Sequence, residues 1–293
     1  MGVIALDFMS KMEAALAAAV GAERVEGPPL LRAAMQHAVL GGGARVRPRL
    51  CLAVAEACGA QRSRLAFGAS LAIELLHCAS LVHDDLPCFD DADQRRGKPS
   101  VHRAFGEPLA VLTGDALIVA AFRTLGEYAS ESPGRLAALL SIVARASGFP
   151  HGIVAGQAWE SESSVDLHAY HQAKTAALFV AATTAGAASA GADPVRWELL
   201  GGCLGEAYQV ADDLRDALGE AADLGKPVGR DRGLDRPTAA GALGPRGALA
   251  RFRELISETL QAVPEGPGAT QLQALIVLEA QRLVPPKLAC LAA

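Results

Sequence analysis

The chain has 293 residues, 51% of them hydrophobic, 20% charged and only 4% aromatic, and its formal net charge is −5. This composition builds a large core mainly from Leu, Ala, Val and Ile, which favours close helix packing over a β-sandwich. The acidic balance argues against a nucleic-acid-binding protein, because such proteins usually carry a basic face. We therefore expect no nucleic-acid partner, although a few local Arg and Lys residues can still form an anion-binding pocket.

Helical periodicity recurs along the chain. In residues 3–20, charged residues interrupt apolar ones at the spacing of an amphipathic helix, so no signal peptide is predicted there. Similar patterns cover residues 68–85, 107–127, 134–148, 168–190, 196–218, 238–262 and 268–284. No segment alternates with a period of two residues, and no low-complexity linker divides the chain. These features predict an all-α fold in a single domain over residues 1–293.

Neither a membrane span nor a disulfide framework is expected. No uncharged apolar stretch reaches the roughly 18–20 residues that a membrane span needs. The six cysteines are scattered without a Cys-x-x-Cys pair, and several lie in apolar runs. That pattern is typical of buried free thiols in a reducing compartment. We therefore expect a cytoplasmic protein that does not span a membrane.

Five aspartates occur within ten residues at the end of the helix predicted for 68–85, in the segment Asp84-Asp85-Leu86-Pro87-Cys88-Phe89-Asp90-Asp91-Ala92-Asp93. Like charges repel, and a carboxylate is unfavourable at the negative C-terminal end of a helix. A divalent cation removes both problems, and magnesium binds one or two carboxylates while taking its other ligands from water and phosphate. The alternative is a solvated acidic loop, which suits Asp91 and Asp93 in particular.

A second acidic cluster, Asp212-Asp213-Leu214-Arg215-Asp216, follows another largely apolar helical run. Asp212 and Asp216 are four residues apart and therefore share one face of a helix. Taken alone, a solvated face or an ion pair with Arg215 explains this cluster as well as metal binding does. Taken together, two acidic clusters at the ends of two apolar helices indicate two walls of one polynuclear metal site.

Basic residues accompany both acidic clusters. Metal ions held by carboxylates commonly bridge to phosphate, and the planar guanidinium of Arg donates two parallel hydrogen bonds to phosphate oxygens. Each basic residue alone is more simply explained as a surface charge, but adjacency to the acids raises the case for phosphate contacts. The candidates are Arg45, Arg47, Arg95, Arg96, Lys174 with Thr175, and Lys226.

In these motifs the sequence resembles the trans-isoprenyl diphosphate synthases over nearly the whole chain, and its wording is most similar to bacterial geranylgeranyl diphosphate synthases of carotenoid and bacteriochlorophyll pathways. The acidic clusters resemble the two aspartate motifs of that family, with Asp84, Asp85, Asp90, Asp212, Asp213 and Asp216 in the motif positions. Residues 42–48 resemble its GGKRxRP segment and Lys174-Thr175 its KT pair, while Gln209 and Lys226 flank the second motif as in the family. Two positions depart from the family, since Ala44 and Arg236 each replace a Lys.

The resemblance implies a bundle of long antiparallel helices around a deep central cavity, usually in a homodimer. It implies that three Mg²⁺ ions, held by the six motif aspartates, clamp an allylic diphosphate that condenses with isopentenyl diphosphate. The implied catalytic residues are Asp84, Asp85, Asp90, Arg95, Lys174, Asp212 and Lys226. The implied substrate-binding residues are Arg45, Arg47, His77, Arg95, Arg96, Lys174, Thr175, Gln209, Lys226 and Arg236.

The same resemblance bears on product length. Ser80 lies four residues before Asp84, on the same helix face, and Ala79 lies next to it. Bacterial farnesyl enzymes tend to carry a bulky aromatic residue at the position of Ala79, so alanine implies room for a further isoprene unit. We therefore expect geranylgeranyl diphosphate, a C20 product, formed from farnesyl diphosphate. The alternatives are a C15 farnesyl synthase, a noncatalytic regulatory subunit, for which only Ala44 speaks, and a terpene cyclase of similar fold.

Overall fold

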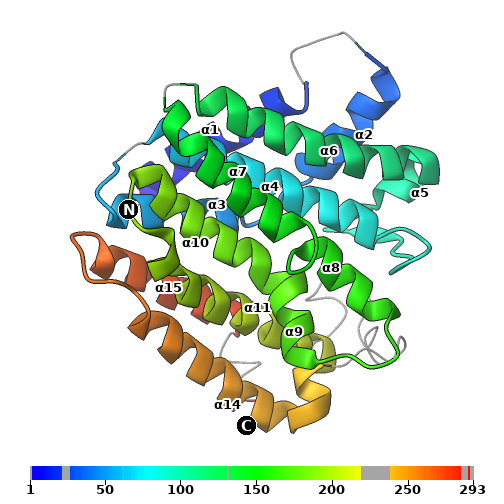
Figure 1. The fold of residues 1–293 in the computed structure, drawn as a ribbon. Helices are drawn as coiled ribbons and strands as arrows, with labels where there is room; N and C mark the ends of the chain where they lie inside the picture. The colour runs from blue at the N-terminus through cyan, green and yellow to red at the C-terminus, as the bar shows by residue number, and fades with distance from the viewer. Residues whose placement is uncertain are drawn as a thin grey trace.

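The computed structural model describes residues 2–21, 27–61, 63–130, 132–218, 238–284 and 290, with side chains from residue 9 onward. The described chain is mostly helical, which confirms the predicted all-α class (Figure 1). The helices are α1 (Gly2–Ala19), α2 (Pro29–Val39), α3 (Val46–Ala57), α4 (Arg64–Asp84), α5 (Val101–Phe105), α6 (Glu107–Tyr128), α7 (Pro133–Ser147), α8 (Ile153–Ala158), η1 (Trp159–Ser161), α9 (Leu167–His171), η2 (Gln172–Ala176), α10 (Ala177–Ala190), η3 (Pro194–Trp197), α11 (Glu198–Leu218), α14 (Ala239–Gln261) and α15 (Ala269–Leu283).

The long helices follow the predicted ranges closely, and the differences concern short elements. The pattern at 168–190 is divided into α9, η2 and α10, because η2 is a π-helical turn. Sequence periodicity missed α2 and α3, which have 11 and 12 residues, too few turns for a clear apolar stripe. One small hairpin is present, β1 (Gln94–Arg95) with β2 (Lys98–Pro99), whose two-residue strands are too short to show alternation in the sequence.

Two buried helices occupy the middle of the bundle. Figure 1 shows α4 and α10 there, with α6 and α7 on one side and α11, α14 and α15 on the other. α10 is rich in alanine and almost entirely buried, so neighbouring helices approach it closely. On α11, a methyl group added to Gly205 would lie 2.4 Å from the Cα atom of Ala176, so only glycine allows this backbone contact. The contact fixes η2, which carries Lys174, against α11.

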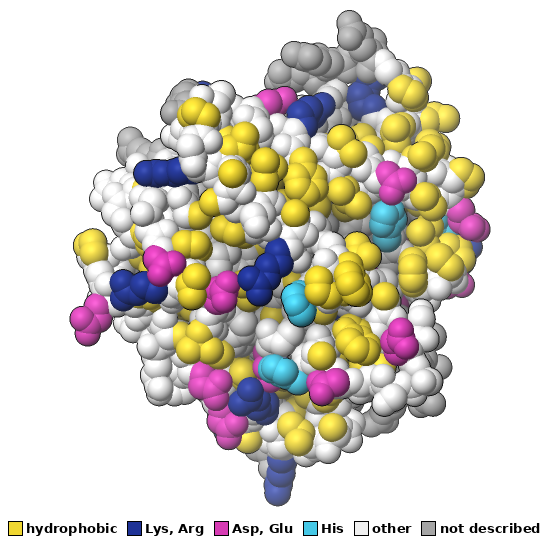
Figure 2. Space-filling view, viewed as in Figure 1, with side chains coloured by type: hydrophobic (Ala, Val, Ile, Leu, Met, Phe, Trp, Pro, Cys, Tyr) yellow, Lys and Arg dark blue, Asp and Glu magenta, His cyan; other side chains and the backbone are white. Residues whose placement is uncertain are grey.

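Two helices have the length and apolar composition of a membrane span, α4 and α6. Length and composition do not separate such a span from a core helix, and 78% of the apolar window of α4 is buried inside the bundle. The corresponding share for α6 is 44%, so a large part of this apolar helix lies on the surface. Figure 2, which shows the face seen in Figure 1, has hydrophobic side chains interspersed with charges of both signs.

Candidate active site

One cavity of about 660 Å³ gathers most of the predicted site residues. Its walls come from α4 and the loop that follows it, from α8, from η2 and from α11, with the β-hairpin at one side. The predicted residues that line it are Arg47, His77, Ala79, Ser80, Asp84, Asp90, Arg95, Lys174, Thr175, Gln209, Asp212 and Asp216. Segments more than a hundred residues apart in sequence therefore meet at one place, as the two acidic clusters predict.

Asp84 and Asp90 form the first acidic wall. Asp84 is the last residue of α4, and the loop then folds back so that the Asp90 amide donates to the Asp84 carbonyl at 2.9 Å. Asp91 takes the left-handed conformation, with φ 45°, which tightens this turn. Burial raises the pKa of the Asp84 carboxyl, while Lys174, whose Nζ lies 3.6 Å from Asp84 Oδ1, opposes the shift. A cation bound here would remove the cost of keeping Asp84 charged.

Asp85, which is predicted as a metal ligand, does not line the cavity. Its carboxylate is buried and accepts three hydrogen bonds from Arg95, from Nε at 3.0 and 3.2 Å and from Nη2 at 2.5 Å. Burial raises the pKa of Asp85 and the hydrogen bonds from Arg95 lower it. Neighbouring residues on a helix point in different directions, so only one of the two aspartates can face the cavity. Asp85 thus holds Arg95, which does line the cavity, in place.

The second acidic wall repeats this division of roles on α11. Asp212 and Asp216 line the cavity, whereas Asp213 is buried behind them. Asp213 Oδ1 accepts a hydrogen bond from Gln209 Nε2 at 2.9 Å, and its Oδ2 accepts one from the Ala239 amide at 2.7 Å. Asp213 therefore ties the start of α14 to α11 and does not line the cavity, although it is predicted as a metal ligand.

Four carboxylates, Asp84, Asp90, Asp212 and Asp216, thus face one cavity from two walls. Within the described ranges, no three acidic, His or Cys side chains come together as a closed metal cluster. Magnesium fits this arrangement, because it takes few protein carboxylates and completes its octahedral shell with water and phosphate oxygens. The donor set is all oxygen, as a hard cation requires. The residues present therefore fit magnesium, which Asp84, Asp90, Asp212 and Asp216 would hold.

A cationic region lies in the same cavity, on α3 and on the inner face of α4. Arg47 is half-buried and lines the cavity, and its Nε is buried without a hydrogen-bond partner among the described residues. Burial, followed by the charges of Arg47 and Arg96, holds the pKa of His77 well below its usual range. Arg96, also predicted to bind substrate, is exposed and does not line the cavity; it donates a hydrogen bond to the Gly42 carbonyl. An anion bound here would meet several donors and a positive potential.

Arg45 does not line this cavity, and the structure gives no support to its predicted role in substrate binding. Its guanidinium is buried and donates to both Glu13 oxygens at 2.7 and 3.0 Å, to Glu74 at 2.8 Å and to the Val39 carbonyl at 2.7 Å. These contacts join α1, α2 and α4 at the start of α3. A guanidinium with this many internal acceptors serves the fold and not a ligand.

Lys174 and Thr175 reach the cavity from η2, and each has a partner that orients it. Lys174 donates to Glu160, which also accepts a hydrogen bond from the Tyr170 hydroxyl at 2.7 Å. Thr175 Oγ1 donates to the Oε1 atom of Gln209 at 2.5 Å. Sequence reasoning did not predict Glu160 as a site residue. Lys226 and Arg236 lie outside the described residues.

The deep end of the cavity is apolar. Ala79 and Ser80 of α4 line it together with Ile118 of α6 and Ile153 of α8. The Ser80 hydroxyl donates to the His77 carbonyl at 2.9 Å, so it presents no free donor to the cavity. No aromatic side chain stands at position 79, where it would narrow the space. This part of the cavity is suited to a hydrocarbon chain.

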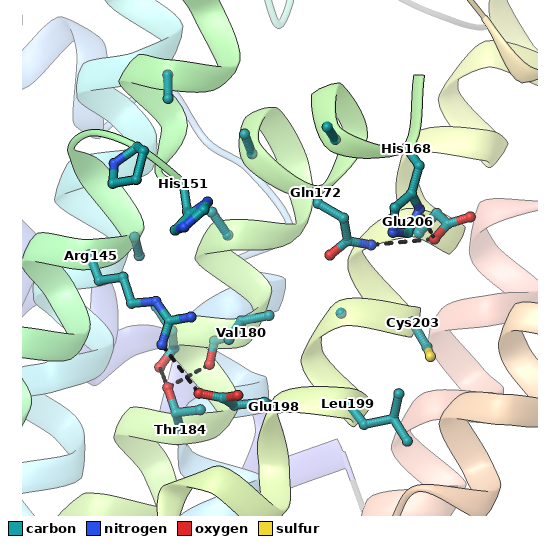
Figure 3. Close-up of a pocket in the computed structure, with 18 of the residues that line it drawn as sticks. Arg145, His151, His168, Gln172, Val180, Thr184, Glu198, Leu199, Cys203 and Glu206 are labelled. Atoms are coloured by element: carbon teal, nitrogen blue, oxygen red, sulfur yellow. Dashed lines mark hydrogen bonds and ion pairs between the residues drawn. The ribbon is translucent and has the colours of Figure 1, made fainter. Parts of the chain in front are cut away.

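A second cavity, of about 1240 Å³, lies on the other face of η2 and α10 and contains none of the predicted site residues (Figure 3). Several of its polar and charged side chains are paired with one another. Arg145 faces Glu198 at 3.5 Å, and Gln172 of η2 donates to Glu206 at 3.3 Å. Glu206 also accepts from Arg251 of α14 at 3.1 Å. These contacts brace η2 from behind, so they help to fix Lys174 and Thr175 in the first cavity.

Comparison with known proteins agrees with the geometry. The polyprenyl synthetase family model matches residues 28–264. A geranylgeranyl diphosphate synthase of Cereibacter sphaeroides is 50% identical, covering 96% of this chain and 98% of the relative. One of Rhodobacter capsulatus is 47% identical, covering 94% and 95%. A geranyltransferase of Helicobacter pylori, solved with magnesium and isoprenyl diphosphate, superposes with a TM-score of 0.82 at 28% identity, covering 94% of this chain and 96% of that one.

The chain therefore belongs to the polyprenyl synthetase family. The resemblance inferred from the aspartate motifs is confirmed, and so is the all-helical fold expected from it.

Proposed function

We propose that this protein is a magnesium-dependent prenyltransferase that condenses isopentenyl diphosphate with farnesyl diphosphate, giving geranylgeranyl diphosphate and diphosphate. The observation that carries the proposal is the division of one cavity into three parts. Two acidic walls face each other, a cationic region lies beside them, and an apolar end carries alanine at position 79. The names of the two bacterial relatives support the C20 product.

The residues of the acidic walls suit the allylic diphosphate. Magnesium ions, three in our proposal, would be held by Asp84, Asp90, Asp212 and Asp216 and would stabilise the negative charge of the leaving diphosphate. Lys174 and Arg95 stand beside the first wall and add donors for the same oxygens. The carbon–oxygen bond breaks with its electron pair going to the diphosphate. Apolar side chains around the hydrocarbon exclude water from the carbocation that remains.

The cationic region suits the second diphosphate. Arg47, His77 and Arg96 would bind isopentenyl diphosphate so that its double bond points at the allylic carbon. The double bond attacks that carbon, a new carbon–carbon bond forms, and the positive charge moves to the tertiary carbon. Loss of one proton restores a double bond. We assign that proton to the released diphosphate, which lies next to the reacting carbons.

The test is a product assay. Purified protein is incubated with magnesium, labelled isopentenyl diphosphate and either dimethylallyl, geranyl or farnesyl diphosphate, and the dephosphorylated products are separated by length. The proposal predicts a C20 alcohol from farnesyl diphosphate. Products that stop at C15 would identify a farnesyl synthase. Consumption of farnesyl diphosphate without isopentenyl diphosphate would identify a cyclase, and no turnover with any primer would favour a regulatory subunit.

We also propose that two copies associate through α6. This helix is apolar enough for a membrane span, yet part of its apolar surface is exposed. The exposed fractions are 43% for Val111, 51% for Leu112 and 68% for Val119. Apolar surface of this kind marks an interaction site, and Leu112 and Val119 lie seven residues apart on one face. Sedimentation should give a dimer for the wild type and a monomer for Val119→Glu. A monomeric wild type would contradict the proposal.

Two further expectations remain proposals. Residues 1–293 would form one domain, supported by the succession of helix contacts from α3 through α4, α10 and α11 to α14. A cytoplasmic location is supported by the unpaired buried thiols of Cys51 and Cys78. Limited proteolysis without a stable fragment and recovery in the cytoplasmic fraction are the expected results. A stable half-size fragment, or recovery elsewhere, would contradict them.

A further inference from the structure

Glu279 of α15 is a buried acid that the proposed reaction does not use. The residue is 4% exposed. Its Oε1 accepts hydrogen bonds from Arg49 Nη1 at 2.7 Å and from Arg282 Nη1 at 3.3 Å, and its Oε2 accepts one from the Tyr208 hydroxyl at 3.3 Å. A carboxylate is costly to bury and is retained where partners satisfy it. These partners come from α3, α11 and α15 itself, so Glu279 joins three helices at one point.

Tyr208 connects this point to the catalytic cavity. The residue precedes Gln209 on α11 and lines the cavity together with Arg47. Its ring packs on Phe179 of α10, with 4.5 Å between the ring centroids. The Cζ atom of Arg47 lies 4.5 Å from the centroid of the same Phe179 ring. Contacts therefore run without a gap from Glu279 through Tyr208 and Phe179 to Arg47.

Arg47 depends on this support because no carboxylate holds it. No ion pair of its guanidinium occurs among the described residues, and its Nε is buried without a partner. Burial lowers the pKa of Arg47. A guanidinium left free for an incoming anion must be aimed by packing, here by the face of Phe179. A shift of the Phe179 ring would therefore move the Arg47 guanidinium, which is proposed to bind the diphosphate of isopentenyl diphosphate.

A second route leads from Glu279 to the same group. Arg49 and Arg47 both lie in the first turn of α3, which begins at Val46. The Arg49–Glu279 pair is the shortest of the contacts that Glu279 makes, and Arg49 is 25% exposed at its side chain. The pair fixes the first turn of α3 against α15. Glu279 thus restrains Arg47 both through the aromatic pair and through the backbone of α3.

We propose that Glu279 is a positioning residue for the isopentenyl diphosphate half of the reaction. By holding Tyr208 and Arg49 it sets where Arg47 lies in the cavity. The inference rests on the proposed function, in which Arg47 binds the second diphosphate. The allylic diphosphate is held at the acidic walls, by residues that Glu279 does not touch. Loss of the Glu279 charge should therefore weaken the binding of isopentenyl diphosphate and leave the binding of the allylic diphosphate unchanged.

The test uses Glu279→Gln, which keeps the size of the side chain and removes its charge. The full-length enzyme is assayed with each substrate varied in turn. We expect KM for isopentenyl diphosphate to rise by on the order of tenfold, the effect of one lost charged hydrogen bond. KM for farnesyl diphosphate should change less than about twofold, within the scatter of independent sites. Tyr208→Phe, which removes only the hydroxyl that donates to Glu279, should shift the same constant in the same direction by less.

A matched control separates positioning from stability. Leu272→Ala removes a buried side chain from the same helix, α15, without touching the Glu279 contacts, and Leu272 is 1% exposed. It should lower the melting temperature and leave the ratio of the two KM values unchanged. The inference would be overturned if Glu279→Gln changed both KM values equally. It would also be overturned if Leu272→Ala changed the ratio of the two KM values as much as Glu279→Gln does. Absence of elongation by the wild type would instead refute the proposed function.

Discussion

Replacing Ala79 by phenylalanine should shorten the product by one isoprene unit. Ala79 lines the apolar end of a cavity of about 660 Å³, and its side chain projects from α4 one residue before Ser80. A benzyl group there would fill space that the last isoprene unit needs. That unit has five carbons, and at about 0.8 kcal/mol per buried carbon its exclusion costs about 4 kcal/mol. Since each 1.4 kcal/mol is a factor of ten, the final addition should slow by about a thousandfold.

The assay is the ratio of C15 to C20 alcohols formed by the wild type and by Ala79→Phe from geranyl diphosphate. Ala79→Ser, which adds one atom, is the matched control and should retain the C20 product. Ala79 is 1% exposed, and overpacking a core position costs about 1–3 kcal/mol, so thermal unfolding is measured alongside. A folded Ala79→Phe enzyme that still makes C20 at the rate of the wild type would refute the reasoning. If Ser80→Phe alone then shortened the product, the floor would lie at position 80.

Two further predictions concern titratable groups. The pKa of His77 is held well below its usual range, so the unfolded chain takes up a proton below about pH 6.5 while the folded protein does not. Between pH 7 and 5.5 the free energy of unfolding should fall by about 1 kcal/mol more for the wild type than for His77→Gln, measured by urea denaturation. Equal pH dependence would contradict this. Burial raises the pKa of Cys51 to about 12, whereas Cys88 is exposed, so iodoacetamide should alkylate Cys88 in the native protein and spare Cys51. Similar rates at both sites, by peptide mass spectrometry, would count against the predicted burial.

The spacing of the acidic residues predicted the two walls but not the roles within them. Asp212 and Asp216 are four residues apart, and both line the cavity as a shared helix face requires. Asp85 and Asp213 each follow a cavity-lining aspartate directly, which turns them to another side of the helix. The same helical geometry that joined Asp212 to Asp216 therefore argued against placing Asp213 with them. The motif therefore predicted the set of residues, and the geometry of the helix determines which of them line the cavity.

Other features depended on partners that no local pattern reveals. Arg45 and Arg47 are two residues apart in one basic segment. The Arg45 guanidinium donates hydrogen bonds to Glu13 and Glu74, whereas Arg47 lines the cavity. Glu279 lies 230 residues from Arg49 and contacts it directly. Such pairs follow from how the helices pack, so sequence periodicity predicted the helices that carry them but not the contacts.

The most direct test of the account is whether both acidic walls are needed for one magnesium-dependent reaction. C20 formation from farnesyl and isopentenyl diphosphates is measured against magnesium concentration for the wild type, Asp84→Asn and Asp212→Asn. Asp115→Asn, on the surface of α6, is the control, since its carboxylate is 59% exposed and lies outside the cavity. The account predicts that either wall variant loses at least about a thousandfold in rate, while the control retains full activity. Normal magnesium-dependent turnover by either wall variant would contradict the two-wall site.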